Sequence, residues 1–177
     1  METFADNLRF NLDLFPEDGL SRDFAIAPSD FAPYLAGEAR ASGAPEAEIP
    51  ELVTSLRGRL DLRLSGRRLI VKGVFAVKVR MTCARCLADF VGRLGDRIDE
   101  VLEIGDPSML GDADDPECFI SVKDQEIDLS PLLAELFWLS WPLKALCDPG
   151  CKGLCQNCGA NLNEGPCQCG GVAETRH

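Results

Sequence analysis

A dense cysteine cluster constrains the fold of this chain more than any other feature. Six of the nine cysteines lie within the 23 residues from Cys147 to Cys169, with the spacing C-x3-C-x3-C-x2-C-x8-C-x-C. Four glycines between them allow the tight turns that bring several sulfurs to one point. A C-x2-C pair, Cys83 and Cys86, lies upstream. A C-x2-C pair followed by further cysteines at ligand spacing strongly indicates metal binding.

The cellular compartment decides between metal binding and disulfides. The start of the chain, residues 1–6, lacks the basic end and apolar core of a signal peptide. The sequence also has no apolar run of transmembrane length. We therefore expect a protein of the reducing cytoplasm that does not enter a membrane, where clustered cysteines bind metal more often than they form disulfides. Redox-active thiols remain the alternative.

The eight clustered cysteines can be grouped in two ways. The preferred hypothesis places Cys155, Cys158, Cys167 and Cys169 in one four-thiolate site and Cys83, Cys86, Cys147 and Cys151 in a second. The alternative joins Cys147, Cys151, Cys155 and Cys158 and leaves Cys167 and Cys169 without partners. Four thiolates leave no open position for water or substrate, so we expect two structural Zn²⁺ ions rather than catalytic ones. The metal would stabilise a lobe that is too small to bury a core of its own.

An alternation of apolar and charged residues over 55–104 is the clearest signal of secondary structure. It predicts three antiparallel strands, near 56–64, 71–81 and 90–104, with one buried and one exposed face. The remaining expected elements are two early strands at 7–15 and 24–27, a helix near 30–41 with Ser29 as its N-cap, a short strand at 118–122, and a helix near 130–141 with Ser130 as its N-cap and Pro131 at N1. The apolar side of the last helix should be buried.

The charge is distributed unevenly along the chain. Residues 57–97 contain eleven Lys and Arg and three Asp and Glu, a net charge of +8, whereas the rest contains seven and 26, a net charge of −19, which together give the total of −11. We interpret one exposed sheet face as a candidate RNA-binding surface, because guanidinium groups grip phosphates in pairs of hydrogen bonds. A solvated face neutralised by the protein's own acidic segments is the alternative. The candidate residues are Arg57, Arg59, Arg63, Lys72, Lys78, Arg80, Arg93 and Arg97, with Arg85 inside the Cys83–Cys86 turn.

Other candidates have simpler interpretations. We expect Cys118 to be a packed free cysteine rather than a redox sensor. His177 is expected to be a disordered terminal residue, and the acidic loop with Asp112, Asp114 and Asp115 to be solvated. Trp138 and Trp141 could stack on bases, but beside leucines at helical spacing they are expected in the core.

The pattern of motifs resembles the YceD family, the large ribosomal RNA subunit accumulation proteins of bacteria and plastids. The resemblance covers roughly residues 55–169. It is carried by Cys83-Ala-Arg-Cys-Leu87, by Pro142-Leu-Lys-Ala-Leu-Cys147, by Cys151-Lys-Gly-Leu-Cys-Gln-Asn-Cys-Gly-Ala-Asn-Leu-Asn163 and by the pair Cys167 and Cys169. It implies a cytoplasmic factor for accumulation of 23S ribosomal RNA and the large ribosomal subunit, without enzymatic activity. The residues agree, because we find no histidine base, phosphate-binding glycine loop or nucleophile–base pair.

We therefore expect an α+β fold with an antiparallel sheet and a packed helix in residues 1–145, and a zinc-binding lobe in residues 146–177. The expected function is a non-catalytic ribosome-assembly factor that contacts ribosomal RNA, a large-subunit precursor or a pre-ribosomal protein, and no small-molecule substrate. Two alternatives remain: an acidic adaptor that binds a basic ribosomal protein or processing enzyme, and a thiol- or metal-handling protein that uses Cys83 and Cys86.

Overall fold

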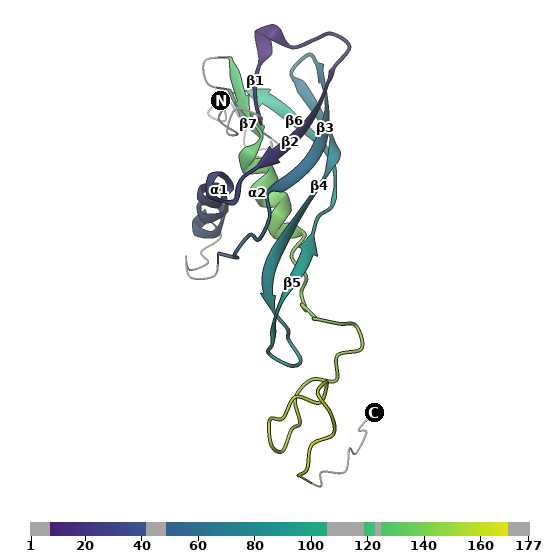
Figure 1. Cartoon of the computed structure of the whole chain (residues 1–177). Coiled ribbons are helices and arrows are strands. Elements are labelled where there is room, and N and C mark those ends of the chain that lie inside the picture. The colour runs from purple at the N-terminus through teal and green to yellow at the C-terminus, as the bar shows by residue number, and fades with distance from the viewer. Residues whose placement is uncertain (1–7, 42–48, 106–118, 123–124, 170–177) are drawn as a thin grey trace, which may run out of the picture. The chain divides into compact units, whose positions relative to one another are not determined.

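The computed structural model describes residues 8–41, 49–105, 119–122 and 125–169. Its contacts divide the chain into two compact units, which are described separately (Figure 1). The described residues of 1–79 and 93–141 form the first unit, and residues 80–92 and 142–169 belong to the second. The segment that was expected to form a lobe thus shares its unit with the hairpin residues 80–92.

The fold class predicted from the sequence is confirmed, because the chain forms antiparallel sheets and two α-helices. The strands are β1 Arg9–Asn11, β2 Leu20–Ile26, β3 Leu56–Ser65, β4 Arg68–Thr82, β5 Asp89–Leu94, β6 Arg97–Gly105, β7 Phe119–Ser121 and β8 Glu126–Asp128. The α-helices are α1 Pro28–Ala41 and α2 Ser130–Leu139, and a 3-10 helix, η2, spans Leu12–Leu14.

The main sheet has the strand order β2-β3-β4-β6-β7, and β5 also pairs with β4. The pairs along this order are antiparallel except the last, in which β6 and β7 run parallel. A second, two-stranded sheet joins β1 to β8. The strand β8 was not predicted, and β2 starts at Leu20, well before the expected strand at 24–27.

The third predicted strand, 90–104, is wrong as one element, because it is divided into β5 and β6. The division falls at Gly95, where the backbone passes so close to β4 that a Cβ atom would lie 2.3 Å from the Phe75 carbonyl oxygen. The next residue, Asp96, accepts a hydrogen bond from the Phe75 amide at 3.1 Å. A glycine inside a strand often marks such a close approach.

The first predicted strand, 7–15, is also too long. Only β1 is extended, and η2 follows directly. The Asn11 side chain accepts a hydrogen bond from the Asp13 amide at 2.9 Å, and this local bond replaces a strand ladder. Leu14, an apolar position of the expected alternation, is 81% exposed.

Period-two burial is confirmed in β3, β4 and β6. One face of the sheet is buried and the opposite face carries charged side chains, as expected for a sheet that covers a core on one side. The buried row consists of Leu56, Leu60, Leu62, Leu69, Val71, Phe75, Val77, Val79, Ile98 and Leu102.

The two helices contact each other through aromatic side chains. The rings of Phe31 in α1 and Phe137 in α2 meet edge to face at 6.2 Å. Trp138 and Trp141 pack on Phe137, with ring centroids at 5.7 and 6.0 Å. In this structure both tryptophans therefore belong to an aromatic cluster.

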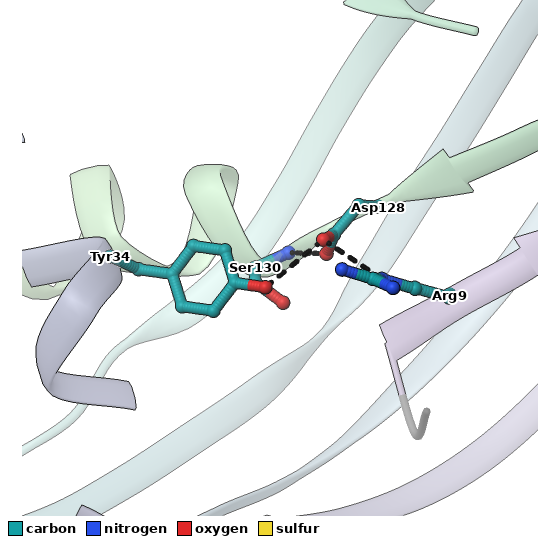
Figure 2. Close-up of polar contacts among 4 residues, drawn as sticks. All are labelled: Arg9, Tyr34, Asp128 and Ser130. Carbon is teal, nitrogen blue, oxygen red and sulfur yellow. Dashed lines mark hydrogen bonds and ion pairs between the residues drawn. The ribbon is translucent and has the colours of Figure 1, made fainter. Parts of the chain in front are cut away.

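Asp128 ties four elements of the first unit together (Figure 2). Its Oδ1 accepts a hydrogen bond from the Ser130 amide at 2.8 Å, and its Oδ2 accepts from the Tyr34 hydroxyl at 3.1 Å and from Arg9 Nε at 3.3 Å. Ser130 is therefore not the N-cap of α2, as predicted. It is the first helical residue, and Asp128 binds its free amide. Ser29 likewise lies inside α1, which begins at Pro28.

Candidate metal centres and basic sheet face

A tight turn at the end of β4 presents the first cysteine pair. Cys83 donates its amide proton to the Ala88 carbonyl, and the Leu87 amide donates back to the Cys83 carbonyl, both at 2.9 Å. Leu87 has a positive φ of 59°, which is uncommon for a residue other than glycine. Cys83 and Cys86 are both buried.

The C-terminal segment returns to this turn and completes the first group of cysteines. The Ala84 amide bonds to the Ala145 carbonyl at 2.8 Å, and the Leu154 amide to the Arg85 carbonyl at 3.2 Å. These bonds bring Cys147 and Cys151 to the first pair, and all four sulfurs lie within 4.8 Å of one another. We call Cys83, Cys86, Cys147 and Cys151 the first tetrad.

The first tetrad has the dimensions of a four-thiolate metal site. A tetrahedron with metal–sulfur bonds of about 2.3 Å has sulfur–sulfur edges of about 3.8 Å. In the structure, Cys83 Sγ lies 3.8 Å from Cys151 Sγ, and Cys86 Sγ lies 3.7 Å from Cys147 Sγ. Phe90, Leu146 and Leu154 pack against this cluster. The residues therefore fit a tetrahedral ion in a largely dry setting.

Cys155, Cys158, Cys167 and Cys169, here the second tetrad, form a more exposed group. Their sulfurs also lie within 4.8 Å of one another. The measured edges are 3.5 Å for Cys155–Cys169, 3.4 Å for Cys155–Cys167 and 3.2 Å for Cys167–Cys169. The expected turn at Cys155–Cys158 is present, since the amide of Gly159, at a φ of 72°, bonds to the Cys155 carbonyl at 2.9 Å.

The structure thus brings the cysteines together in the two groups of the preferred hypothesis, and the alternative grouping is not found. Both groups can hold a metal ion. Each offers four sulfur ligands and no position for a substrate, which is the arrangement of structural metal sites.

The metal-free tetrads are electrostatically uneven. Backbone amides of Cys147 and Cys86 lower the pKa of Cys83 to about 6, whereas burial raises the pKa of Cys147 to about 12. In the second tetrad, backbone amides of Cys158 and Asn157 lower the pKa of Cys155 to about 6, and the hydrogen bond with Cys169 raises the pKa of Cys167 to about 12. One sulfur of each group is therefore ready to meet a cation as a thiolate at neutral pH.

Two side chains support the first tetrad from outside. The Arg85 guanidinium donates from Nη1 to the carbonyls of Cys151 at 2.8 Å and of Pro149 at 3.4 Å. Asn163 Nδ2 donates to Cys151 Sγ at 3.2 Å, and this bond is the main reason that the pKa of Cys151 is lowered. We predicted Arg85 only as an RNA contact, and we did not single out Asn163. Nothing in the cysteine spacing indicates this asparagine.

The exposed face of the main sheet carries the cations predicted for the first unit. The register places Arg59 opposite Val74 and Val74 opposite Arg97, so residues of β3, β4 and β6 share this face. We call it the basic sheet face. A shallow depression of about 460 Å³ adds Arg93, since its lining includes Val74, Arg93 and Arg97. Arg80 and Arg85 belong to the second unit instead.

Carboxylates are interleaved with these cations. Asp61 lies 3.6 Å from Arg59, Asp99 lies 3.2 Å from Lys72, and Glu103 lies 3.2 Å from Arg68. Asp23 is directly opposite Arg59 in the register. The neutralisation that we kept as an alternative is therefore present over part of the face. Within the described residues, no ion pair is found for Arg57, Arg63, Lys78, Arg93 or Arg97.

Some predictions cannot be placed. Cys118, His177 and the acidic residues Asp112, Asp114 and Asp115 lie outside the described residues. As for membranes, neither α1 nor α2, nor any other helix in the described ranges, has both the length and the apolar character needed to cross a bilayer.

Two four-cysteine groups and a charged sheet face define a small cysteine-rich α+β protein. The model of one family, described as "Large ribosomal RNA subunit accumulation protein YceD", matches residues 71–176, more than half of the 177 residues. The chain therefore belongs to the YceD family.

Individual relatives cover shorter stretches. The chain is 48% identical over 46 residues to the "Large ribosomal RNA subunit accumulation protein YCED homolog 1, chloroplastic" of Arabidopsis thaliana, which is 26% of this chain and 14% of that protein. It is 44% identical over 59 residues, 32% of this chain and 20% of the other, to the Zea mays protein of the same name. It is 31% identical over 109 residues to an uncharacterized protein of Mycobacterium tuberculosis, which is 60% of this chain and 52% of the relative. The matches thus span about half of these relatives at most, and no solved structure matches the chain.

Proposed function

We propose that this protein is a non-catalytic ribosome-assembly factor of the cytoplasm that supports accumulation of 23S ribosomal RNA and of the large ribosomal subunit. Family membership supports the proposal, because the family and two of the relatives are named for large ribosomal RNA subunit accumulation. The structural observation that carries it is the set of arginines on the basic sheet face that have no carboxylate partner in the described residues.

The basic sheet face suits a phosphate backbone rather than base recognition. Arg93 and Arg97 line one depression with Val74, and Arg59, Lys72 and Arg97 line a neighbouring one of about 320 Å³. Arginines can form paired hydrogen bonds with phosphate oxygens. The aromatic rings on which bases would stack are absent from both linings, and such contacts position a protein on RNA without reading its sequence. We therefore infer modest, sequence-independent affinity, and specificity from additional contacts.

The two tetrads have a structural role in this proposal. Each binds one Zn²⁺ through four thiolates, a ligand set that suits zinc and leaves no open position for chemistry. Bound metal would neutralise the crowded thiolates and hold residues 80–92 and 142–169 in one compact unit. Zinc would then stabilise the second unit, while the first unit supplies the RNA-facing surface.

A protein-binding adaptor is the second candidate. The carboxylates of Asp23, Asp61 and Asp99 on the same face favour it, because they repel phosphates and can pair with a basic ribosomal protein. The two candidates differ in which charge of the face makes the contact.

The test is a charge-reversal pair on the basic sheet face. In the host cell, Arg63→Glu with Arg97→Glu should lower the ratio of 23S to 16S ribosomal RNA and abolish crosslinks between the protein and ribosomal RNA. Asp23→Lys with Asp99→Lys is the matched control on the same face, and it should keep both. If the reversal of arginines leaves RNA crosslinks unchanged and the reversal of aspartates removes protein crosslinks, the adaptor candidate is correct.

A further inference from the structure

Asn163 occupies a position between the two tetrads. It lies in the segment between Cys158 and Cys167, which are ligands of the second tetrad, yet its side chain contacts Cys151 of the first. A single side chain thus connects the chain segment closed by one site to a sulfur of the other.

The backbone explains how Asn163 reaches Cys151. Residues 153–155 and 160–162 fold onto each other: the Cys155 amide bonds to the Ala160 carbonyl at 2.8 Å, and the Leu162 amide to the Gly153 carbonyl at 2.9 Å. An isolated bridge pairs Leu154 with Asn161. The second tetrad closes this ribbon, because Cys155 and Cys158 lie in its turn and Cys167 and Cys169 follow it. Asn163 is carried at its end.

Hydrogen bonds fix the orientation of the Asn163 amide. Its Oδ1 accepts from the Lys152 amide at 2.8 Å, while its Nδ2 donates to Cys151 Sγ at 3.2 Å and to Asn161 Oδ1 at 2.8 Å. The reverse orientation would place Oδ1 against a thiolate and Nδ2 against an N–H group. Only the observed orientation satisfies all three partners.

We propose that Asn163 is a positioning residue that couples the two metal sites: metal at the second tetrad fixes the ribbon, and the ribbon holds the Asn163 amide on the Cys151 sulfur of the first. This inference rests on the proposed metal binding. Four thiolates around one divalent ion leave excess negative charge, and a donated N–H reduces it at Cys151. Outer partners of this kind typically change metal affinity 10- to 100-fold. Because binding linkage is reciprocal, metal at the first tetrad also strengthens the second.

The experiment is a double-mutant cycle on the full chain loaded with zinc, in which a colour-forming chelator reports metal release. The variants are Asn163→Ala, the site-deleted Cys155→Ser/Cys158→Ser protein, and the combination of both. Asn157→Ala, an exposed asparagine in the Cys155–Cys158 turn, is the matched control. Asn163→Asp is a second variant, which keeps the acceptor for Lys152 but turns an oxygen toward the sulfur.

We expect Asn163→Ala to accelerate release from the first tetrad by roughly 10-fold or more, Asn163→Asp to do so more strongly, and Asn157→Ala to have no effect. In the site-deleted protein, release is already faster, and Asn163→Ala adds nothing. Wild-type kinetics in Asn163→Ala, or the same acceleration in both backgrounds, would overturn the coupling while leaving metal binding intact. A wild-type chain that binds no metal would overturn the proposed metal function itself and the coupling with it.

Discussion

The sulfur of Cys83 lies 3.8 Å from the sulfur of Cys151, although the two residues are 68 positions apart in the chain. The first comes from the end of a long strand and the second from a segment with little regular structure. Their meeting defines the second compact unit, whose small apolar cluster consists of buried cysteines and a few neighbours. The stability of this unit should depend on what the sulfurs bind.

Metal content is the first prediction. The purified chain should contain about two zinc ions, as two four-thiolate sites require. Cys86→Ser and Cys158→Ser should each reduce the content to one, because each removes a ligand from a different tetrad. Cys118→Ser is the control and should retain both ions. Elemental analysis by mass spectrometry measures the ratio, and a single ion in the wild-type protein would contradict the two-site assignment.

Metal removal should affect the two units differently. After chelation, residues 83–88 and 145–163 should lose amide-exchange protection, because their mutual hydrogen bonds surround the tetrads. The first unit should keep its protection, since its core consists of apolar side chains such as Leu60, Val71 and Phe137. Hydrogen exchange read by mass spectrometry tests this. Simultaneous loss of protection in β3 and in the cysteine segments would show that the metal supports the whole chain.

Asp128→Ala should lower the free energy of unfolding of the first unit by about 1–2 kcal/mol, because it frees the first amide of α2 and removes the partner of Tyr34. Tyr34→Phe, which removes only one of these bonds, should cost about 1 kcal/mol or less. Urea unfolding followed by tryptophan fluorescence measures both. Asp13→Ala, at an exposed carboxylate, is the control, and an equal loss there would contradict a specific role for Asp128.

Two glycines should respond to alanine in opposite directions. Gly95→Ala should destabilise the protein by about 1–3 kcal/mol, because its Cβ would overlap the Phe75 carbonyl. Gly37→Ala should stabilise it by up to about 1 kcal/mol, because the site lies in helix α1 and the added methyl group meets no atom within 4 Å. Thermal and chemical unfolding of the two variants should show this opposite sign, and a destabilised Gly37→Ala protein would contradict the described α1.

Salt should weaken RNA binding, with a slope set by the number of phosphate contacts. For single-stranded RNA the slope of log affinity against log salt changes by about 0.7 for each contact. Arg63→Gln and Arg97→Gln should each reduce the slope by about that amount. Arg68→Gln, whose guanidinium is already paired with Glu103, should change it less. Fluorescence anisotropy across a salt series measures the slopes, and equal slopes in all four proteins would exclude direct contact by this face.

The sequence was sufficient to predict the two tetrads, because counting decides the matter. Once Cys155, Cys158, Cys167 and Cys169 are grouped by proximity, Cys147 and Cys151 need two more sulfurs, and Cys83 and Cys86 form the only other C-x2-C pair. The buried and exposed faces of β3 and β4 were equally accessible, since alternation needs no knowledge of the partner strand.

Features that depend on pairing between strands were not predicted. Asp99 and Glu103 follow Arg97 at alternate positions, so the pattern could have placed them on the exposed face, but only the register shows that they meet Lys72 and Arg68. The break at Gly95 results from the approach of β4, which no local signal reveals. Asn163 is in the same position, because its partner is a sulfur brought near by the fold of the ribbon.

The long separation within the first tetrad also sets an order of events during synthesis. Cys86 and Cys147 are 61 residues apart, and the elements β6 and α2 are made between them. A nascent chain therefore carries Cys83 and Cys86 without their partners until the first unit has been completed, whereas the second tetrad is made within a short final segment. Joining such distant cysteines restricts the unfolded chain as a long-loop crosslink does, by about 4 kcal/mol in the entropy model for disulfides. The ion that closes the first tetrad would thus act as a late fastener between the middle and the end of the polypeptide.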